Sequence, residues 1–232
     1  MRYPVFFIAC LFALQYGYGQ ADTTTYLDSI KAELRKEWPK NRTINLVFHG
    51  HSVPSGYFKT PFVNTFDAYP YQVLKQLKER YPNAVINVIV TAIGGEHSES
   101  GAKRFSTDVL PHRPDVLFID YALNDRMMGT ERSRIAWEKM IRMALEQHIP
   151  VILLTPTPHQ QFPMTGAAAA YAPFAAGIRN FAQKYNIGLA DSYSAFEQKL
   201  KEGHAVTEYM SQVNHPNKDG HAVVAHEIMK WF

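Results

Sequence analysis

The sequence predicts an α/β protein in which helices cover both faces of a parallel sheet, a three-layer α/β/α sandwich. Two observations lead to this prediction. Five short segments are almost wholly apolar, as strands buried on both faces are, and they alternate with longer segments of helical periodicity. Alternation of this kind produces parallel strands joined by right-handed crossovers. We therefore expect a five-stranded parallel sheet.

The expected elements follow one another with short connections. The expected strands are the apolar segments 44–49, 85–90, 116–120, 151–155 and 188–190. The expected helices are 68–81, 98–109, 131–147, 171–185, 192–201 and 218–231. In the third helix, apolar residues recur at helical spacing from Ile135 to Ala144, and Pro150 ends the pattern just before a strand.

Length and composition limit the class of protein. At 232 residues the chain suits one domain with a sizeable core and would be tight for two. Hydrophobic residues make up 46% and charged residues 19%, which is ordinary for a globular protein. The net charge of +3 comes without a long block of Lys or Arg, so nucleic acid is not an expected partner.

The N-terminus has the pattern of an export signal. Arg2 gives a positive start, residues 5–14 form an apolar run, and Gly17 and Gly19 occupy the −3 and −1 positions of a cleavage before Gln20. The run of about ten residues is too short to span a bilayer, which needs roughly 20.

We therefore expect a signal peptide at 1–19 and one mature domain at 20–232, without stable membrane insertion after cleavage. The single cysteine, Cys10, would leave with the signal, so the mature chain would have no disulfide. An exported protein without disulfides fits a bacterial periplasm or exterior.

Residues suited to acyl transfer follow the expected strands. Ser52 follows the first strand in a Gly-x-Ser turn, Gly95 follows the second and Asn124 follows the third, while His215 precedes the last helix. Ligands bind beyond the carboxyl ends of parallel strands, so we expect these residues at one site. Acyl transfer needs a nucleophile, a base and donors for the developing oxyanion. The four residues supply these parts.

The order of these blocks resembles the SGNH (GDSL-type) hydrolases: serine after the first strand, glycine after the second, Asn-Asp after the third and a late His-Pro-Asn. The match extends from 47 to 231. The resemblance implies a flavodoxin-like fold and ester hydrolysis without a cofactor. It gives Ser52 the role of nucleophile and His215 that of base. It makes Gly95 and Asn124 oxyanion donors, together with the N–H of Ser52.

Three positions depart from the family pattern. Gly-Asp-Ser becomes Gly-His-Ser through His51, and Leu123 replaces the glycine before Asn-Asp. The acid three residues before the histidine becomes Gln212. Such an acid fixes the histidine tautomer and stabilises the imidazolium, and in serine proteases its replacement by an amide costs about 10⁴ in turnover.

Three arrangements around His215 therefore stay open. In the first, which we favour, Gln212 orients the imidazole through its amide oxygen and the site works as a Ser–His dyad. In the second, a carboxylate from elsewhere takes the place of the acid, with Asp191 and Glu208 as the nearest candidates. In the third, the enzyme is slow.

Metal-binding side chains lie near the expected strand ends: His49, His51, His97 and Asp125. His49 and His51 are two residues apart and face the same way on a strand. No third ligand has convincing spacing, so we expect no metal. The alternative is that both histidines line the pocket beside Ser52. We expect Asp125 to be a structural cap or a group that supports the site residues from behind, and not a catalytic acid.

Loops at this edge supply candidate substrate contacts, of which we single out His51, Tyr57 and Arg126. Aromatic rings here could stack on a sugar, and Lys59 or Arg126 could pair with a uronate. Packing of loop residues on each other is an equally good interpretation.

The sequence thus predicts a secreted serine esterase acting on a small-molecule or glycan ester, with acetyl groups on a glycan as the expected substrate. One alternative is a glycan O-acetyltransferase, which moves the acyl group to a sugar hydroxyl. The other is a non-catalytic carbohydrate-binding protein with a degraded site, which Gln212 keeps open. The oligomeric state is not predicted.

Overall fold

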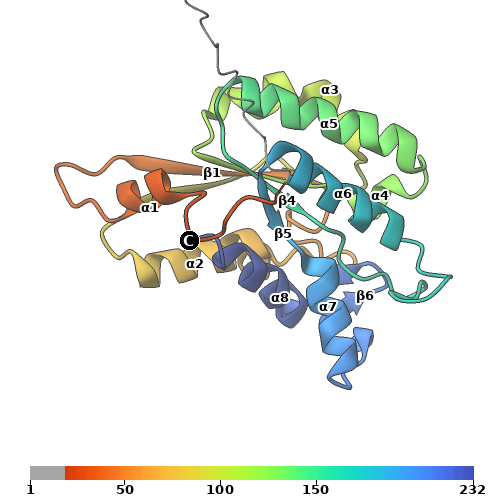
Figure 1. Ribbon diagram of the computed structural model, residues 1–232. Helices are drawn as coiled ribbons and strands as arrows, with labels where there is room; N and C mark the ends of the chain where they lie inside the picture. Colours follow the sequence, from red (N-terminus) through yellow and green to blue (C-terminus); the bar gives the residue numbers. More distant parts are fainter. Residues whose placement is uncertain (1–18) are drawn as a thin grey trace, which may run out of the picture.

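A computed structural model gives the structure of the protein and describes residues 19–232. Its five-stranded sheet is parallel throughout, with strand order β2-β1-β3-β4-β5, and helices lie on both faces (Figure 1). The predicted three-layer α/β/α fold is confirmed. The expected signal peptide at 1–19 lies outside the described residues, apart from Gly19, and stays a prediction.

The strands alternate between two hydrophobic cores. They are β1 (Thr43–Gly50), β2 (Val85–Val90), β3 (Val116–Asp120), β4 (Val151–Leu154) and β5 (Gly188–Ala190). Successive side chains of a strand point to opposite faces. On β3, Phe118 therefore packs in one core, stacked on Phe48 with 4.3 Å between ring centroids, while Leu117 and Ile119 pack in the other.

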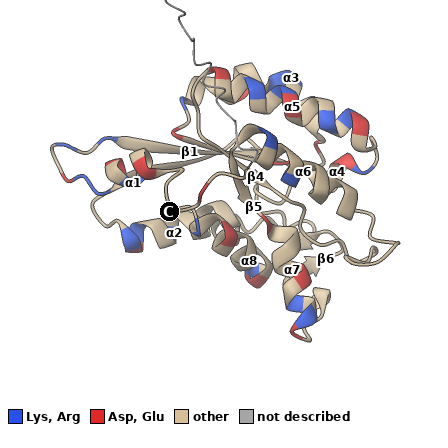
Figure 2. Ribbon diagram, in the orientation of Figure 1, with Lys and Arg blue, Asp and Glu red and all other residues tan. Residues whose placement is uncertain are grey.

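The helices divide between the two faces. Those on one face are α3 (Ser98–Asp108), α5 (Thr130–Glu146) and α6 (Ala172–Tyr185). Those on the other are α1 (Asp28–Leu34), α2 (Tyr69–Arg80), α7 (Ser192–Lys201) and α8 (Lys218–Met229). Their charged residues lie mainly on the outer surfaces (Figure 2). Among residues 19–232, no helix is both long and apolar enough to cross a bilayer.

Three short elements were not expected from the sequence. They are α1, the single turn α4 (Ala122–Asp125), and an antiparallel hairpin of β6 (Met210–Gln212) and β7 (His215–Pro216). Each is too short for a hydrophobic period to be recognised over its length. Two of them carry expected site residues, since α4 carries Asn124 and the hairpin carries His215.

Candidate active site

Ser52 lies in the turn directly after β1. The turn approaches the end of β3 so closely that a Cβ on Gly50 would collide with the carbonyl of Asp120, which leaves room only for glycine. Ser52 is 4% exposed, and its Oγ lies 3.0 Å from the Nε2 of His215. The structure therefore brings the expected nucleophile and the expected base within hydrogen-bonding distance.

His215 is held by the hairpin and by the start of α8. The Oγ of Ser211 donates a hydrogen bond to the backbone carbonyl of His215 across 3.0 Å. Two residues later, the Oδ1 of Asn217 accepts from the backbone N–H groups of Asp219 and Gly220, both at 3.0 Å, and so caps α8. This explains the Asn of the late His-Pro-Asn block: it caps the helix that follows the histidine and so fixes the position of that helix.

The other ring nitrogen of His215 has two neighbours. Its Nδ1 lies 3.0 Å from the backbone carbonyl oxygen of Phe58 and 2.6 Å from the Nε2 of Gln212. The amide oxygen of Gln212 instead accepts from Thr60, at 3.1 Å from its N–H and 3.3 Å from its Oγ1. Our expectation that this oxygen orients the imidazole is therefore wrong: Thr60 holds it.

The two neighbours favour different tautomers of His215. A proton on Nδ1 is donated to the carbonyl of Phe58, which leaves Nε2 free to accept the proton of Ser52. The amide NH₂ of Gln212 favours an unprotonated Nδ1 and hence a proton on Nε2, a form that cannot act as base. The Phe58 carbonyl thus supports the base-competent form, and Gln212 opposes it.

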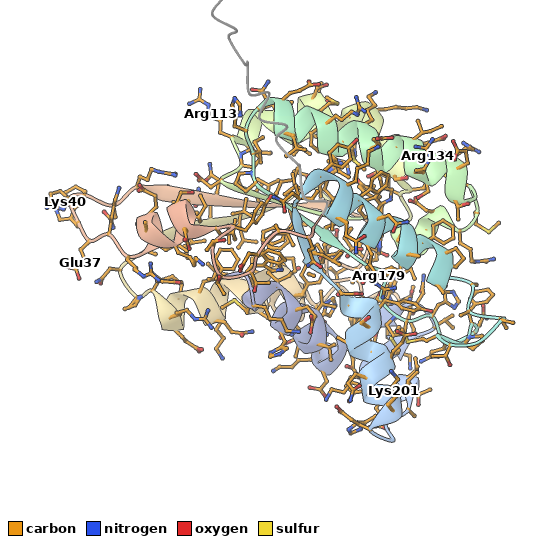
Figure 3. All side chains as sticks on the ribbon, viewed as in Figure 1. Glu37, Lys40, Arg113, Arg134, Arg179 and Lys201 are labelled. Atoms are coloured by element: carbon orange, nitrogen blue, oxygen red, sulfur yellow. The ribbon has the colours of Figure 1, made fainter. Side chains whose placement is uncertain are left out.

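Neither candidate carboxylate replaces the missing acid. Asp191 caps α7 by accepting from the N–H of Ser194, and it binds Arg179 of α6 at 2.7 Å. Arg179 is labelled in Figure 3, between α6 and α7. Glu208 accepts from the N–H of Ala205 and pairs with the side chain of His204. Both carboxylates are used elsewhere because each belongs to the start of a local helical turn.

The surroundings of His215 also set its charge. Burial lowers the pKa of His215 below the usual 6.5; the hydrogen bond to the Phe58 carbonyl opposes this shift, and the charge of His51 adds to it. The imidazole is therefore neutral, and able to accept a proton, at neutral pH.

Backbone donors surround the turn of Ser52. Among residues 19–232, no hydrogen bond uses the N–H of Ser52 or that of Gly95. Gly95 has φ +76°, a conformation that other residues rarely adopt. The side chain of Asn124 donates one Nδ2 proton to the carbonyl of Glu96 across 2.9 Å, which leaves the other proton free.

The strand order brings these donors to one place. Gly95, Ser52 and Asn124 follow β2, β1 and β3, and these three strands are neighbours with β1 in the middle. The strand order thus brings the segments that carry Gly95 and Asn124 to the two sides of the strand that leads to Ser52. Such an arrangement can stabilise an oxyanion that develops beside Ser52.

Two expectations about the histidines at the end of β1 are wrong. His51 is 1% exposed, so it does not line a pocket. Its Nδ1 accepts from the N–H of Val53 at 3.2 Å, and its Nε2 lies 3.4 Å from the Oδ1 of Asp120. His51 therefore stabilises the turn that carries Ser52 from the buried side. His49 is also buried and belongs to a separate polar network.

The other two candidate metal ligands, His97 and Asp125, differ in their surroundings. The Nδ1 of His97 is buried and has no hydrogen-bond partner among the described residues. Asp125 accepts from the N–H of Ser98, the Oγ of Ser133 and the Nε1 of Trp137, which confirms it as a structural cap. Within residues 19–232, no cluster of three or more His, Cys, Asp or Glu side chains is arranged to hold a metal ion.

The structure places Tyr57 at the site. Its ring lies 5.8 Å from that of His215 between centroids, and a Cβ on Gly94 would collide with it. Tyr57 is 39% exposed, so part of the ring is available to a ligand.

Arg126 packs against the loop that follows β4. Its guanidinium lies 4.4 Å from the ring centroid of Phe162, in the loop after β4. The same loop reaches the hairpin, where the N–H of Gln160 donates to the carbonyl of Val213 across 2.8 Å. No measured contact joins Arg126 to Ser52.

Sequence reasoning missed Phe58, Asp120 and Glu96. Phe58 acts through its backbone carbonyl, for which no side-chain pattern gives a signal. Asp120 is the last residue of an expected strand, and Glu96 directly follows Gly95. A carboxylate at the end of a buried strand is unusual, and this was the signal available for Asp120.

Comparison with protein families identifies a family to which most of the chain is similar. The sequence profile of the GDSL-like Lipase/Acylhydrolase family matches residues 48–223. That range contains Ser52, Gly95, Asn124 and His215. A search of curated proteins found no match.

Solved structures share the fold. A two-domain esterase (CEX) active on acetylated mannans matches with TM-score 0.73 and 24% identity, over 94% of this chain and 55% of that one. This chain thus spans about half the length of that esterase. A catalytic mutant of Axe2, an acetylxylan esterase from Geobacillus stearothermophilus, matches with TM-score 0.70 and 19% identity, over 81% and 93%. A putative lipolytic protein of the G-D-S-L family from Desulfitobacterium hafniense matches with TM-score 0.64 and 23% identity, over 81% and 99%.

Proposed function

Because the chain belongs to the GDSL-like lipase/acylhydrolase family of ester hydrolases, we propose that it is an exported serine esterase that removes acetyl groups from a glycan. The observation that carries the proposal is the 3.0 Å separation between the Oγ of Ser52 and the Nε2 of His215. The free N–H groups beside Ser52 support it, because an acyl-transfer site needs them for the oxyanion.

In the acylation step, Ser52 is the nucleophile. Its Oγ attacks the ester carbonyl carbon while its proton passes to the Nε2 of His215. The carbonyl oxygen becomes an oxyanion, which accepts hydrogen bonds from the N–H of Ser52, the N–H of Gly95 and the Nδ2 of Asn124. The tetrahedral intermediate then collapses, the bond to the alcohol breaks, and the imidazolium gives its proton to the leaving alcohol. The product is an acetyl-Ser52 enzyme.

Deacylation repeats these roles with water. His215 takes a proton from water as the oxygen attacks the acetyl-enzyme, and the same donors hold the second oxyanion. The Ser52 ester bond breaks, the imidazolium returns its proton to Oγ, and acetic acid leaves and ionises to acetate in solution. His215 stays in the base-competent tautomer through its Nδ1–H bond to the Phe58 carbonyl.

The acetylated glycan is supported by two observations. Two of the similar structures carry names that include acetylated mannans and acetylxylan. In this chain, the partly exposed ring of Tyr57 lies beside His215, where it could stack on a sugar. Export rests on the N-terminal pattern around Arg2 and residues 5–14.

The test is release of acetate from acetylated xylan and acetylated glucomannan by the mature chain. We expect acetate to appear with the wild type and not with Ser52→Ala. The matched control is Ser55→Ala, which lies in the same turn but whose Oγ donates to the carbonyl of Ala92. Acetate release by Ser52→Ala at the wild-type rate would contradict the proposal.

Two further outcomes separate the alternatives. Transfer of the acetyl group to an added acceptor glycan in place of water would identify an O-acetyltransferase. Binding of the glycan without any turnover of the glycan or of an aryl acetate would identify a non-catalytic binding protein.

A further inference from the structure

A largely buried ion pair holds the loop that carries Gly95. The carboxylate of Glu96 accepts from Arg104 of α3, with 2.8 Å from Nε to Oε1 and 2.5 Å from a terminal guanidinium nitrogen to Oε2. It also accepts from the hydroxyl of Tyr121 across 2.8 Å. The side chains of Glu96 and Arg104 are only 8% and 15% exposed. The pair is therefore shielded from solvent and fixed by several hydrogen bonds.

The network continues to the end of β1. The Nε2 of His49 lies 3.1 Å from the hydroxyl of Tyr121, and its Nδ1 lies 2.9 Å from the Oγ1 of Thr91. Burial lowers the pKa of His49 to about 4, so the ring is neutral and links two hydroxyl groups. His49, Thr91 and Tyr121 stand at the ends of β1, β2 and β3. The network thus ties together the three strands that carry Ser52, Gly95 and Asn124.

Glu96 connects this network to the expected oxyanion donors. Its own backbone carbonyl accepts from the Nδ2 of Asn124 across 2.9 Å, and so determines where the free proton of that amide points. The residue directly before Glu96 is Gly95, whose N–H is the second donor. One side chain, anchored by Arg104, therefore fixes the backbone on which both donors depend.

We propose that Arg104, acting through Glu96, is a positioning residue for the oxyanion hole, with Asn124 as the donor that it orients. The proposal rests on the proposed esterase function. Donors accelerate acyl transfer only if they are already aimed at the developing oxyanion. A buried charged pair is a poor way to gain stability alone, because apolar residues of similar volume often serve at least as well. Its location at this loop gives it a role in geometry.

The test compares Arg104→Met with a matched control in the full mature chain. The control is Arg132→Met, because Arg132 makes a similar pair with Glu99, also on α3, at 2.8 Å and 2.5 Å but at an exposed position. With an aryl acetate as substrate, we expect Arg104→Met to lower kcat by about tenfold or more, since small misplacements of catalytic groups have effects of this size. KM and the midpoint of the pH profile should stay unchanged. Arg132→Met should leave kcat unchanged, and Arg104→Lys should recover part of the loss.

A double-mutant cycle identifies the group through which Arg104 acts. In the Asn124→Ala background, Arg104→Met should lower kcat by much less than it does in the wild type, because the amide it orients is already absent. Tyr121→Phe, which removes a single hydroxyl from the network, should lower kcat by a few-fold and serves if Arg104→Met does not fold.

Three results would overturn the proposal. The first is a folded Arg104→Met variant with an unchanged kcat. The second, which applies if Arg104→Met does not fold, is a folded Tyr121→Phe variant with an unchanged kcat. The third is a double variant whose loss in kcat equals the product of the losses in Arg104→Met and Asn124→Ala. A wild type that hydrolyses no ester would instead contradict the proposed esterase function. Failure of the positioning role and failure of the esterase function are therefore distinguishable.

Discussion

The carbonyl oxygen of Phe58 lies 3.0 Å from the Nδ1 of His215, in the position where a serine-hydrolase triad has its acid. A carbonyl carries only a partial negative charge. It can therefore select the tautomer of the imidazole, but it stabilises the imidazolium less than a carboxylate would. The base of this site is accordingly a weak one, and its protonation is easily tuned by its neighbours.

The variant Gln212→Asp should turn the dyad into a triad. A carboxylate beside Nδ1 would raise the pKa of His215 and stabilise the imidazolium formed during acylation. We expect kcat to rise by tenfold or more, with the roughly 10⁴ effect of the triad acid in serine proteases as an upper bound. The acid limb of the kcat/KM profile should move to higher pH, because a histidine with a raised pKa stays protonated, and inactive, up to a higher pH.

The control for this variant is Gln212→Leu, which removes the amide without adding charge. It should leave kcat unchanged or raise it slightly, because the amide NH₂ of Gln212 no longer favours the tautomer of His215 that carries its proton on Nε2. A fall in kcat of tenfold or more in Gln212→Leu would mean that the amide of Gln212 supports catalysis.

The wild-type pH profile follows from the depressed pKa of His215. Burial lowers this pKa below 6.5, so the neutral, base-competent form persists into mildly acidic solution. The midpoint of the acid limb should lie below pH 6.5, where the imidazole takes up a proton. The measurement is kcat/KM for an aryl acetate from pH 4 to 8, and an acid limb centred above pH 7 would be inconsistent with the buried, carbonyl-bound ring.

Asn124→Ala tests the oxyanion hole. Removal of one such donor costs about 10² to 10³ in kcat in other hydrolases. We expect a loss of that size with little change in KM, because the donor acts on the oxyanion and not on the bound ester. Thermal unfolding should confirm that the variant stays folded, since the amide makes a single hydrogen bond, to the carbonyl of Glu96. A kcat within threefold of the wild-type value would mean that Asn124 is not an oxyanion donor.

Asp125 should matter for stability more than for chemistry. Its carboxylate is fully buried and accepts from Ser98, Ser133 and Trp137. Asp125→Ala leaves these donors without a partner, at about 1–3 kcal/mol for each unsatisfied group. We expect the free energy of unfolding to fall by at least about 3 kcal/mol. Asp219→Ala, an exposed aspartate in the first turn of α8, should change it by less than about 1 kcal/mol.

Acid should destabilise the fold through its buried histidines. Burial lowers the pKa of His221 to about 3 and that of His49 to about 4, while both titrate near 6.5 in the unfolded chain. Below pH 6.5 the unfolded state therefore binds more protons, and the free energy of unfolding should fall progressively down to about pH 3. Denaturant titrations at several pH values should show a smaller acid loss for His221→Gln than for the wild type. An equal loss would mean that His221 is not the residue responsible.

The sequence predicts the sheet well because its strands are buried on both faces and carry a strong apolar signal. The bounds of β2, β3 and β5 agree with the expected segments. β1 is one residue longer than expected at both ends, and β4 is one residue shorter at its C-terminal end. The hairpin that carries His215 is missed, because strands of three and two residues have no measurable pattern.

The candidate site is predicted in part, for a related reason. Residues that follow a strand are placed by topology, so Ser52 and Asn124 follow two neighbouring strands, β1 and β3. Contacts made through the backbone leave no trace in the side-chain pattern, so the carbonyl of Phe58 is not foreseen. The direction in which a side chain points is also not foreseen: His51 is turned inward to Asp120, and the amide oxygen of Gln212 is turned to Thr60.

The role of Ser52 as nucleophile is tested most directly by the site of covalent modification by a serine-directed fluorophosphonate, measured by the intact mass of the protein and by peptide mapping. We expect one phosphonyl group per chain, on Ser52, with a labelling rate that falls steeply in His215→Ala and no labelling in Ser52→Ala. A label on any other residue, or an unlabelled wild type that still hydrolyses the ester, would contradict it.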